Sequence, residues 1–492
     1  MSKQNGGIIG PDNVPTGAFG AASGVWKLSD VTNYKRQGTW PVALSGHQVA
    51  NSCRFDDGSS DYLTESVSST SNRRTFTYST WIKRSSLSGS GYPRLFNPFV
   101  NSANFFDIFF RDTDALNVYS QNADSNDMNL VTNALFRDLS AWYHIVVAVD
   151  TTQGTDSNRV KLYVNGTQET SFSASTYPSQ NTDFQINLDT VTNVIGRNQA
   201  GSDNYFDGYM SEIVFVDGSQ LAPTSFGEFN SQTGIWIPKD VSGLTFGTNG
   251  FYLDFKDSSA LGNDAAGSNN FTANNLTAID QSTDTCTNNF ATLNPLDTTR
   301  GLSDGNLTYA GAGSGTVVKG TIAVNSGKYY AECKILDASE NMIGVLDIGQ
   351  APTTSYVGAS SVGWGIYTGD GNLYNGASAS SYSSAFSDND IMGIALDMDN
   401  NKLYFSKNGV WQNSGDPTSG STGTGAISIT SGLTMTFCGG RDSASDTASF
   451  NFGSPPYAIS SGNVDSSGMG NFEYAVPSGY YSLCTRNLNL IG

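Results

Sequence analysis

WYHIVVAVD (142–150) and RVKLYVNGTQ (159–168) are the two stretches of sequence that decide the fold. The first is an almost unbroken apolar run, which suits a strand that is buried on both faces. The second alternates apolar and polar residues and then reaches the pair Asn165-Gly166. Asn-Gly is a strong hairpin signal because both residues tolerate a positive φ. Together these patterns predict neighbouring strands of a β-sheet.

The same alternation recurs along the chain. TFTYSTWIKR (75–84) places aromatic and aliphatic residues on one face, and YFDGYMSEIVFVDG (205–218) reads as a further pair of strands. GKYYAECKIL (327–336) and DIMGIALDMDNNKLYFSKNG (390–409) repeat the pattern near the C-terminus. Only seven of the 44 acidic residues are Glu, and the rest are Asp, a turn former and poor helix former. The sequence therefore predicts an all-β protein.

Chain length, net charge and cysteine spacing limit the classes of protein to which this chain can belong. A chain of 492 residues exceeds the roughly 250–300 residues at which a single core stops growing, so we expect several domains. The net charge of −19 argues against binding to nucleic acid, and no apolar run is long enough for membrane insertion. The start of the chain lacks the apolar core of a signal peptide. Five widely spaced cysteines without a CxxC pair favour reduced thiols.

Changes in pattern suggest four regions. Residues 1–24 are rich in Gly and Pro and read as an extended arm for attachment. Residues 25–220 and 298–492 each contain the strand and turn signals of a sandwich. Residues 221–297 are less regular, so we interpret them as an irregular linker with short strands.

Two segment sets resemble known domain families. FDDGSSDYL (55–63), WYHIVVAVD and FDGYMSEIVFVD (206–217), in that order, resemble the laminin-G-like, concanavalin A-like lectin/glucanase superfamily. VGWGIYTGDGNLYNG (362–376) and NKLYFSKNGVWQ (401–412) resemble the SPRY domain. Both resemblances imply concanavalin-like jelly-roll β-sandwiches. The SPRY resemblance also implies protein binding through loops at one end of the sandwich.

Three further segments resemble junction and terminal pieces of structural proteins from tailed phages. They are GVWKLSDV (24–31), TCTNNFATLNPL (285–296) and PSGYYSLCT (477–485). This resemblance implies a virion-surface protein, made in the host cytoplasm and attached to other virion proteins through its N-terminal arm. It also implies a homo-oligomer, such as the trimers common among appendages. A tail fibre or receptor-binding protein and a head fibre or capsid decoration protein are both left open.

The lectin/glucanase resemblance requires a test for catalysis. Retaining glycosidases need paired carboxyls about 5–5.5 Å apart, and the expected Glu-x-Asp-x-x-Glu pattern is absent. Glu212 and Glu228 are isolated, and Asp397 and Asp399 read as turn-capping residues. His144 lies inside an apolar strand and reads as a hydrogen-bonded core histidine. We therefore predict a protein that is not an enzyme, with a polysaccharide depolymerase as the alternative.

Two turn-rich segments offer what sugar binding needs, an aromatic ring beside amides and carboxylates. RNQAGSDNYFDG (197–208) and GDGNLYNG (369–376) contain these groups. The predicted ligand-binding residues are Asp203, Asn204, Tyr205, Tyr374 and Asn375. The alternative is a pair of ordinary loops whose tyrosines pack on the sandwich edge.

Calcium is the one cofactor that the laminin-G-like resemblance implies. Such domains often hold Ca²⁺ at one rim through Asp and carbonyl oxygens, which are its preferred ligands. The candidate metal ligands are Asp56, Asp57, Asp203 and Asp207. Because many Asp-Gly pairs here also suit plain turns, this site is a hypothesis beside that of ordinary turn residues.

Overall fold

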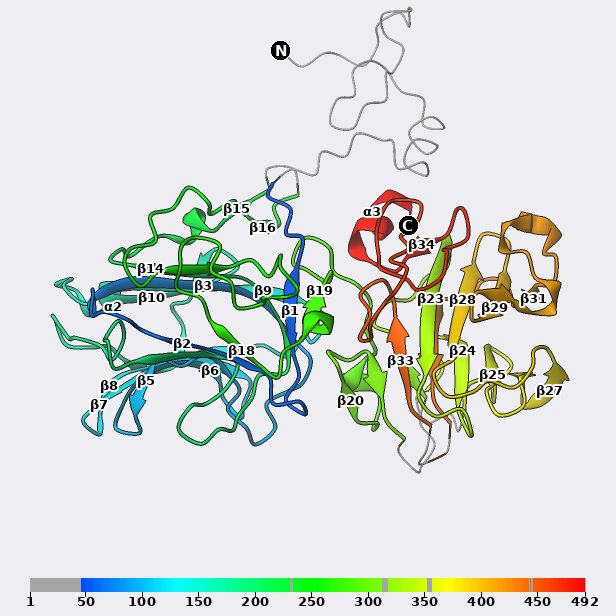
Figure 1. Cartoon of the computed structure of the whole chain (residues 1–492), viewed down its shortest axis with the longest axis horizontal. Helices are drawn as coiled ribbons and strands as arrows, with labels where there is room; N and C mark the ends of the chain where they lie inside the picture. Colours follow the sequence, from blue (N-terminus) through cyan, green and yellow to red (C-terminus); the bar gives the residue numbers. More distant parts are fainter. Residues whose placement is uncertain are drawn as a thin grey trace, which may run out of the picture.

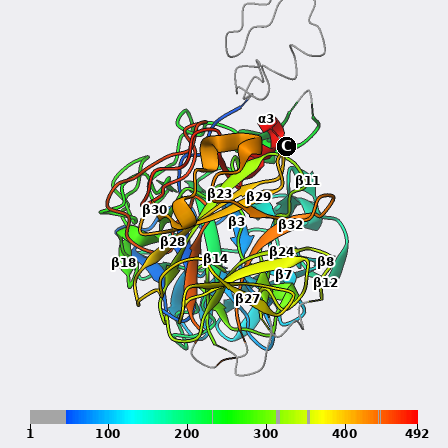
Figure 2. The same ribbon diagram turned by 90° about the vertical axis from the view of Figure 1, so that its right-hand side faces the viewer.

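The structure is a computed structural model in which two β-sandwiches lie side by side (Figure 1). It describes residues 46–230, 233–311, 317–351, 356–441, 443 and 446–491. The predicted arm at 1–24 lies outside these residues. Viewed from the side, the sandwiches lie one behind the other along the long axis of the molecule (Figure 2). No helix in the described ranges is long and apolar enough to cross a membrane.

The first sandwich consists of two large sheets. One sheet has the order β11 (Thr167–Gln168), β10 (Val160–Val164), β9 (Trp142–Asp150), β3 (Thr75–Arg84), β14 (Gly208–Asp217), β1 (Ser52–Phe55) and β19 (Gln281–Ser282), with β17 (Phe251–Leu253) also paired to β14. The facing sheet has the order β12 (Phe172–Thr176), β8 (Ser125–Leu135), β7 (Ala115–Asn122), β6 (Asn104–Phe110), β5 (Phe99–Asn101), β13 (Thr192–Ile195), β2 (Tyr62–Ser66) and β18 (Thr272–Asn274), with β4 (Arg94–Phe96) also paired to β6. A small hairpin is formed by β15 (Gly227–Phe229) and β16 (Trp236–Pro238).

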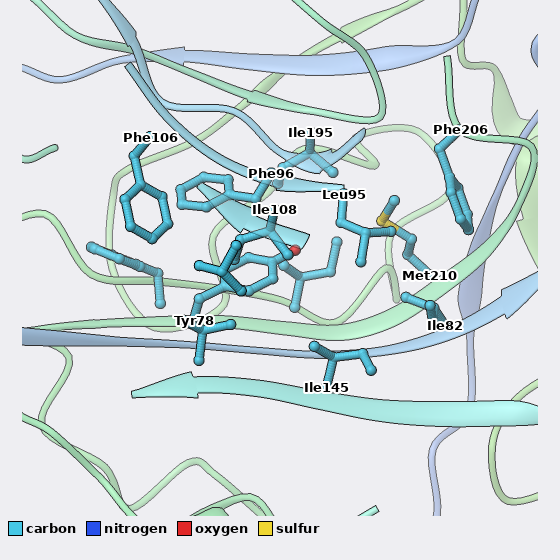
Figure 3. Packing of buried hydrophobic residues seen from close by; sticks show 14 of the residues in the cluster. Tyr78, Ile82, Leu95, Phe96, Phe106, Ile108, Ile145, Ile195, Phe206 and Met210 are labelled. Carbon is cyan, nitrogen blue, oxygen red and sulfur yellow. The ribbon is translucent and has the colours of Figure 1, made fainter. Parts of the chain in front are cut away.

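The core of the first sandwich follows from strand alternation. Tyr78 and Ile82 of β3 and Phe106 and Ile108 of β6 all belong to one buried cluster between the two sheets (Figure 3). Tyr78 also stacks on Phe96, with the ring centroids 4.7 Å apart. Burying a side chain of this size contributes about 1.5–3 kcal/mol. The all-β sandwich predicted from the alternation is confirmed.

The Asn165-Gly166 hairpin is also confirmed. These residues have φ values of 47° and 77°, as a two-residue hairpin of this type requires. Gly166 is needed for a second reason, because a Cβ there would lie 2.4 Å from the Trp236 ring. A tight turn and close packing by the β15–β16 hairpin therefore select glycine at one position.

The second sandwich again pairs two sheets. One has the order β20 (Leu302–Ser303), β21 (Thr308–Tyr309), β33 (Ala448–Asn451), β23 (Lys328–Ile335), β28 (Ile391–Asp397), β29 (Lys402–Lys407) and β30 (Val410–Trp411), with β31 (Ile427–Ser428) also paired to β29 and β34 (Tyr481–Ser482) also paired to β23. The other has the order β22 (Val318–Lys319), β32 (Met435–Gly439), β24 (Met342–Asp347), β25 (Gly363–Tyr367), β26 (Asn372–Asn375) and β27 (Ser378–Ser381). The short helices are α2 (Asp156–Arg159), α3 (Thr485–Ile491), η2 (Pro223–Ser225), η3 (Ala278–Asp280), η4 (Pro295–Asp297), η5 (Gln412–Ser414) and η6 (Pro417–Thr422).

Two predictions about the organisation are wrong. Residues 221–297 do not form a linker, because β17, β18 and β19 pair with strands of the first sandwich and Phe251 and Phe271 enter its core. Strands of two or three residues are too short to show alternation, which explains the error. The segment 205–218 contains the single strand β14, over Gly208–Asp217, rather than a pair of strands. Its register shifts where Glu212 adopts a φ of 50°, which is the geometry of a bulge.

Buried polar contacts lie where the two sandwiches meet. Lys83 Nζ of β3 lies 2.8 Å from Asp284 Oδ2, and both side chains are at most 2% exposed. Trp142 Nε1 donates to the other carboxylate oxygen of Asp284 at 3.1 Å. Arg54, also buried, donates to the backbone oxygen of Pro455 in the second sandwich. The sandwiches therefore share a desolvated interface.

Candidate functional site

A pocket at one rim of the first sandwich brings together most of the predicted site residues of that domain. Its volume is about 420 Å³, and its lining includes Asp57, Tyr92, Asp203, Asn204 and Tyr205. This size lies within the usual range of ligand pockets. The predicted groups therefore share one surface depression.

Local hydrogen bonds fix the loop residues that line the rim pocket. Asn204 has a φ of 54°, and its Oδ1 atom accepts a hydrogen bond from Tyr92 N at 2.8 Å. Asp203 Oδ1 accepts from Asn198 Nδ2 at 2.9 Å. The ring of Tyr205 lies against Tyr62, with the centroids 6.3 Å apart. Each predicted residue thus has a structural contact in addition to its place on the pocket wall.

The predicted calcium ligands are only partly assembled. Asp56 Oδ1 accepts a hydrogen bond from Gly58 N at 2.7 Å, and its Oδ2 accepts one from Asp304 N at 2.6 Å. Both carboxylate oxygens are therefore already bonded to backbone N–H groups. Burial, followed by the nearby charges of Asp57 and Asp56, raises the pKa of Asp207 well above its usual value. Within the described ranges, no group of three His, Cys, Asp or Glu side chains is placed to hold a metal ion. Calcium binding by the four acids stays a prediction.

The two predicted residues of the second sandwich lie on β26, away from the rim pocket. Tyr374 makes edge contacts with Tyr356 and Tyr367, at centroid distances of 6.1 and 6.3 Å. Asn375 Nδ2 donates to Gly363 O at 2.8 Å. These contacts are those of a tyrosine packed at an edge and an amide that holds a loop. The sequence-predicted ligand residues therefore fall into two separate places.

His144 is a core histidine, as predicted. Trp236 Nε1 donates to its Nδ1 at 3.0 Å, and its Nε2 lies 2.8 Å from Ser79 Oγ. Burial lowers the pKa of His144 to about 3, so the ring is neutral and Nε2 carries the proton. Asp397 also caps its turn as predicted, since its Oδ1 accepts from Asn400 N at 3.0 Å.

A second pocket, called the sheet-face pocket below, lies on the outer face of the sheet that contains β6 and β7, and the sequence did not suggest it. Its volume is about 260 Å³, and Tyr92, Arg94, Phe105, Asp107 and Tyr119 help to line it. The signal available was the lone acid in the strand NFFDIFF (104–110), because a carboxyl between apolar residues needs a reason to be there.

Comparison with family models identifies both sandwiches. Residues 57–222 match the concanavalin A-like lectin/glucanases superfamily, and residues 328–441 match the SPRY domain. A search of curated proteins gave no match.

Among solved structures, the SPRY domain of human HERC1 is 18% identical and has a TM-score of 0.26; the match covers 32% of this chain and 96% of that one. The TRIM65 PSpry domain is 16% identical and has a TM-score of 0.27, with coverage of 33% and 91%. The combination of the two matched domain types suggests a binding role. Residues 57–222 form a concanavalin A-like lectin/glucanase domain, and residues 328–441 form a SPRY domain.

Proposed function

We propose that this protein is a non-enzymatic adhesion protein on the surface of a tailed-phage virion, and that it binds host-surface glycan at the rim pocket. The observation that carries the glycan proposal is the rim pocket itself, where Tyr205 lies beside Asn204 and Asp203. An aromatic face packs against the apolar side of a sugar ring, and the amide and carboxylate groups bond its hydroxyls. The virion assignment is supported by the three phage-like segments named above.

Replacing Tyr205 by alanine is expected to weaken glycan binding about tenfold, which corresponds to about 1.4 kcal/mol. The substitution removes the ring face but leaves the backbone of the rim loop in place. The measurement is binding of the purified protein to an array of bacterial O-antigen and capsular oligosaccharides. Tyr374→Ala is the matched variant in the second sandwich and should bind like the wild type. A loss confined to Tyr374→Ala would contradict the rim-pocket proposal.

The virion proposal has a separate test. Cryo-electron microscopy of intact particles should show two adjoining sandwiches on the outside of the tail or the head. Density at the tail would support a receptor-binding role, and density on the capsid would support a head fibre or decoration. A particle without this chain would contradict the proposal but leave the glycan measurement valid.

A further inference from the structure

Residues 46–49, which we call the entry segment, precede β1 and lie against the first sandwich. Gly46 is so close to β16 that a Cβ there would lie 2.5 Å from the Ile237 side chain. Val49 N donates a hydrogen bond to Thr287 Oγ1 at 3.2 Å. The two ends of the entry segment therefore contact different parts of the sandwich.

His47 of the entry segment lies beside a buried acid of β14. Its Nε2 atom is 3.6 Å from Oε2 of Glu212. The side chain of His47 is 23% exposed and that of Glu212 is 7% exposed, so solvent reaches the imidazole but hardly screens the carboxylate. A protonated imidazole gains an ion pair from this contact, whereas a neutral ring does not.

Glu212 is held in place by the backbone and by side chains. It has a φ of 50° at the bulge where the register between β14 and β3 shifts, and a residue other than glycine keeps this conformation only where its surroundings fix it. Tyr252 OH donates to Glu212 Oε2 at 2.8 Å, the same oxygen that faces His47. Ser211 Oγ donates to Asn51 O at 3.0 Å, so the bulge also contacts the chain just before β1. The acid is therefore fixed, and the histidine belongs to the segment that can respond.

The other charged groups near His47 follow β16 and β17. Asp240, after β16, favours the protonated ring. Lys256, after β17, opposes it. The Lys256 Nζ atom lies 2.9 Å from Asp254 Oδ2, so its charge is largely balanced by that carboxylate. The surroundings of His47 therefore carry an excess of negative charge.

This balance of charge sets the direction of the pH dependence. Contact with the Glu212 carboxylate, the largest effect, raises the pKa of His47 above its usual value of 6.5, and partial burial opposes the rise. Tyr252 and Cys286 also lie near Glu212, and burial raises the pKa of each, so both stay neutral near pH 7. Because the pKa of His47 is higher in the folded state, its stabilising effect is fully present below pH 6.5 and is lost as the pH rises through the folded value.

We propose that His47 and Glu212 form a pH-operated latch, which fastens the entry segment to the first sandwich in mildly acidic solution and loosens it in alkaline solution. Residues 1–45 join the sandwich through this segment, so the latch links the pH of the surroundings to their point of attachment. It goes beyond glycan binding at the rim pocket and does not depend on it.

The first measurement is the titration of His47 in the full chain, by NMR with labelled histidine. The only other histidine, His144, is buried and has a pKa of about 3, so it does not titrate near neutral pH. We expect the pKa of His47 to lie above 6.5 in the wild type and to fall to 6.5 or below in Glu212→Gln. Asp240→Asn removes a nearby charge outside the latch and should lower the pKa less.

The second measurement is hydrogen exchange of the Val49 amide, which is bonded to Thr287, at about pH 5 and about pH 8 with correction for the intrinsic rate. Protection should be greater at the lower pH, by about tenfold for each unit by which the pKa of His47 in the wild type exceeds that in Glu212→Gln. His47→Gln should give equal protection at both pH values. Amides 145–149 of β9 are the internal control and should not differ between the variants.

Each outcome decides the proposal. A pKa of His47 that Glu212→Gln leaves unchanged, or equal protection of Val49 at both pH values in the wild type, would overturn the latch. Loss of the pH dependence in His47→Gln supports it even where Glu212→Gln fails to fold, because His47 is partly exposed and its replacement leaves Glu212 bonded to Tyr252.

Discussion

Replacing Lys83 by methionine is expected to lower the free energy of unfolding by about 3–5 kcal/mol. The substitution leaves the Asp284 carboxylate, 1% exposed, without its cation between the two sandwiches. Breaking one half of a buried pair is costly because the remaining charge stays desolvated. Chemical denaturation followed by tryptophan fluorescence would measure the loss, since Trp142 donates to the same carboxylate.

Two variants control this experiment. Arg74→Met breaks an ion pair of similar length, 2.7 Å to Asp183, but its side chains are 42% and 44% exposed, so solvent screens the pair and we expect a much smaller loss. The double variant Lys83→Met/Asp284→Asn removes both charges and should recover part of the loss. Equal losses in Lys83→Met and Arg74→Met would show that burial at the junction has no energetic role.

The fold was predictable where strands are long enough to show either alternation or a continuous apolar run. The ten residues of β3 alternate, the nine of β9 form an almost unbroken apolar run, and the Asn165-Gly166 turn follows from φ preference alone. The contributions of β17 and β18 were not predictable, because three residues carry no period and their partners lie far away in sequence. The contact between Lys83 and Asp284 spans 201 positions and leaves no local signal.

The residues of the candidate site also include some that were predictable from the sequence and some that were not. Asp203, Asn204 and Tyr205 were predictable because a loop rich in turn formers exposes its side chains. The placement of Tyr92 beside them depends on a hydrogen bond across 112 positions. The sheet-face pocket was missed because NFFDIFF (104–110) looks like a plain buried strand until its partners β4 and β7 are known.

The second large effect concerns Glu332 of β23, which is fully buried and should make the stability depend on pH. Burial raises the pKa of this carboxyl from 4.5 to about 7, so the folded state holds its proton more tightly than the unfolded state does. Its contribution to the free energy of unfolding is therefore fully present below about pH 4.5 and is lost as the pH rises to about 7. The loss between pH 4.5 and 7 is about 3 kcal/mol. In Glu332→Gln this part of the pH dependence should disappear, as measured by denaturant unfolding at pH 5 and pH 8.

Glu473 supplies a control, because its effect on stability should change with pH in the opposite direction. Its backbone is hydrogen-bonded to Glu332. Glu332 accepts hydrogen bonds from Glu473 N and Tyr474 N, at 2.9 and 2.8 Å. The side chain of Glu473 accepts hydrogen bonds from Ser460, which lower its pKa. Its contribution is present above pH 4.5 and is lost as the pH falls, so Glu473→Gln should matter at pH 8 and not at low pH. If the stability of Glu332→Gln depends on pH as that of the wild type does, the prediction is wrong. The four groups that donate hydrogen bonds to the wild-type Glu332 carboxylate would then keep it charged in spite of its burial.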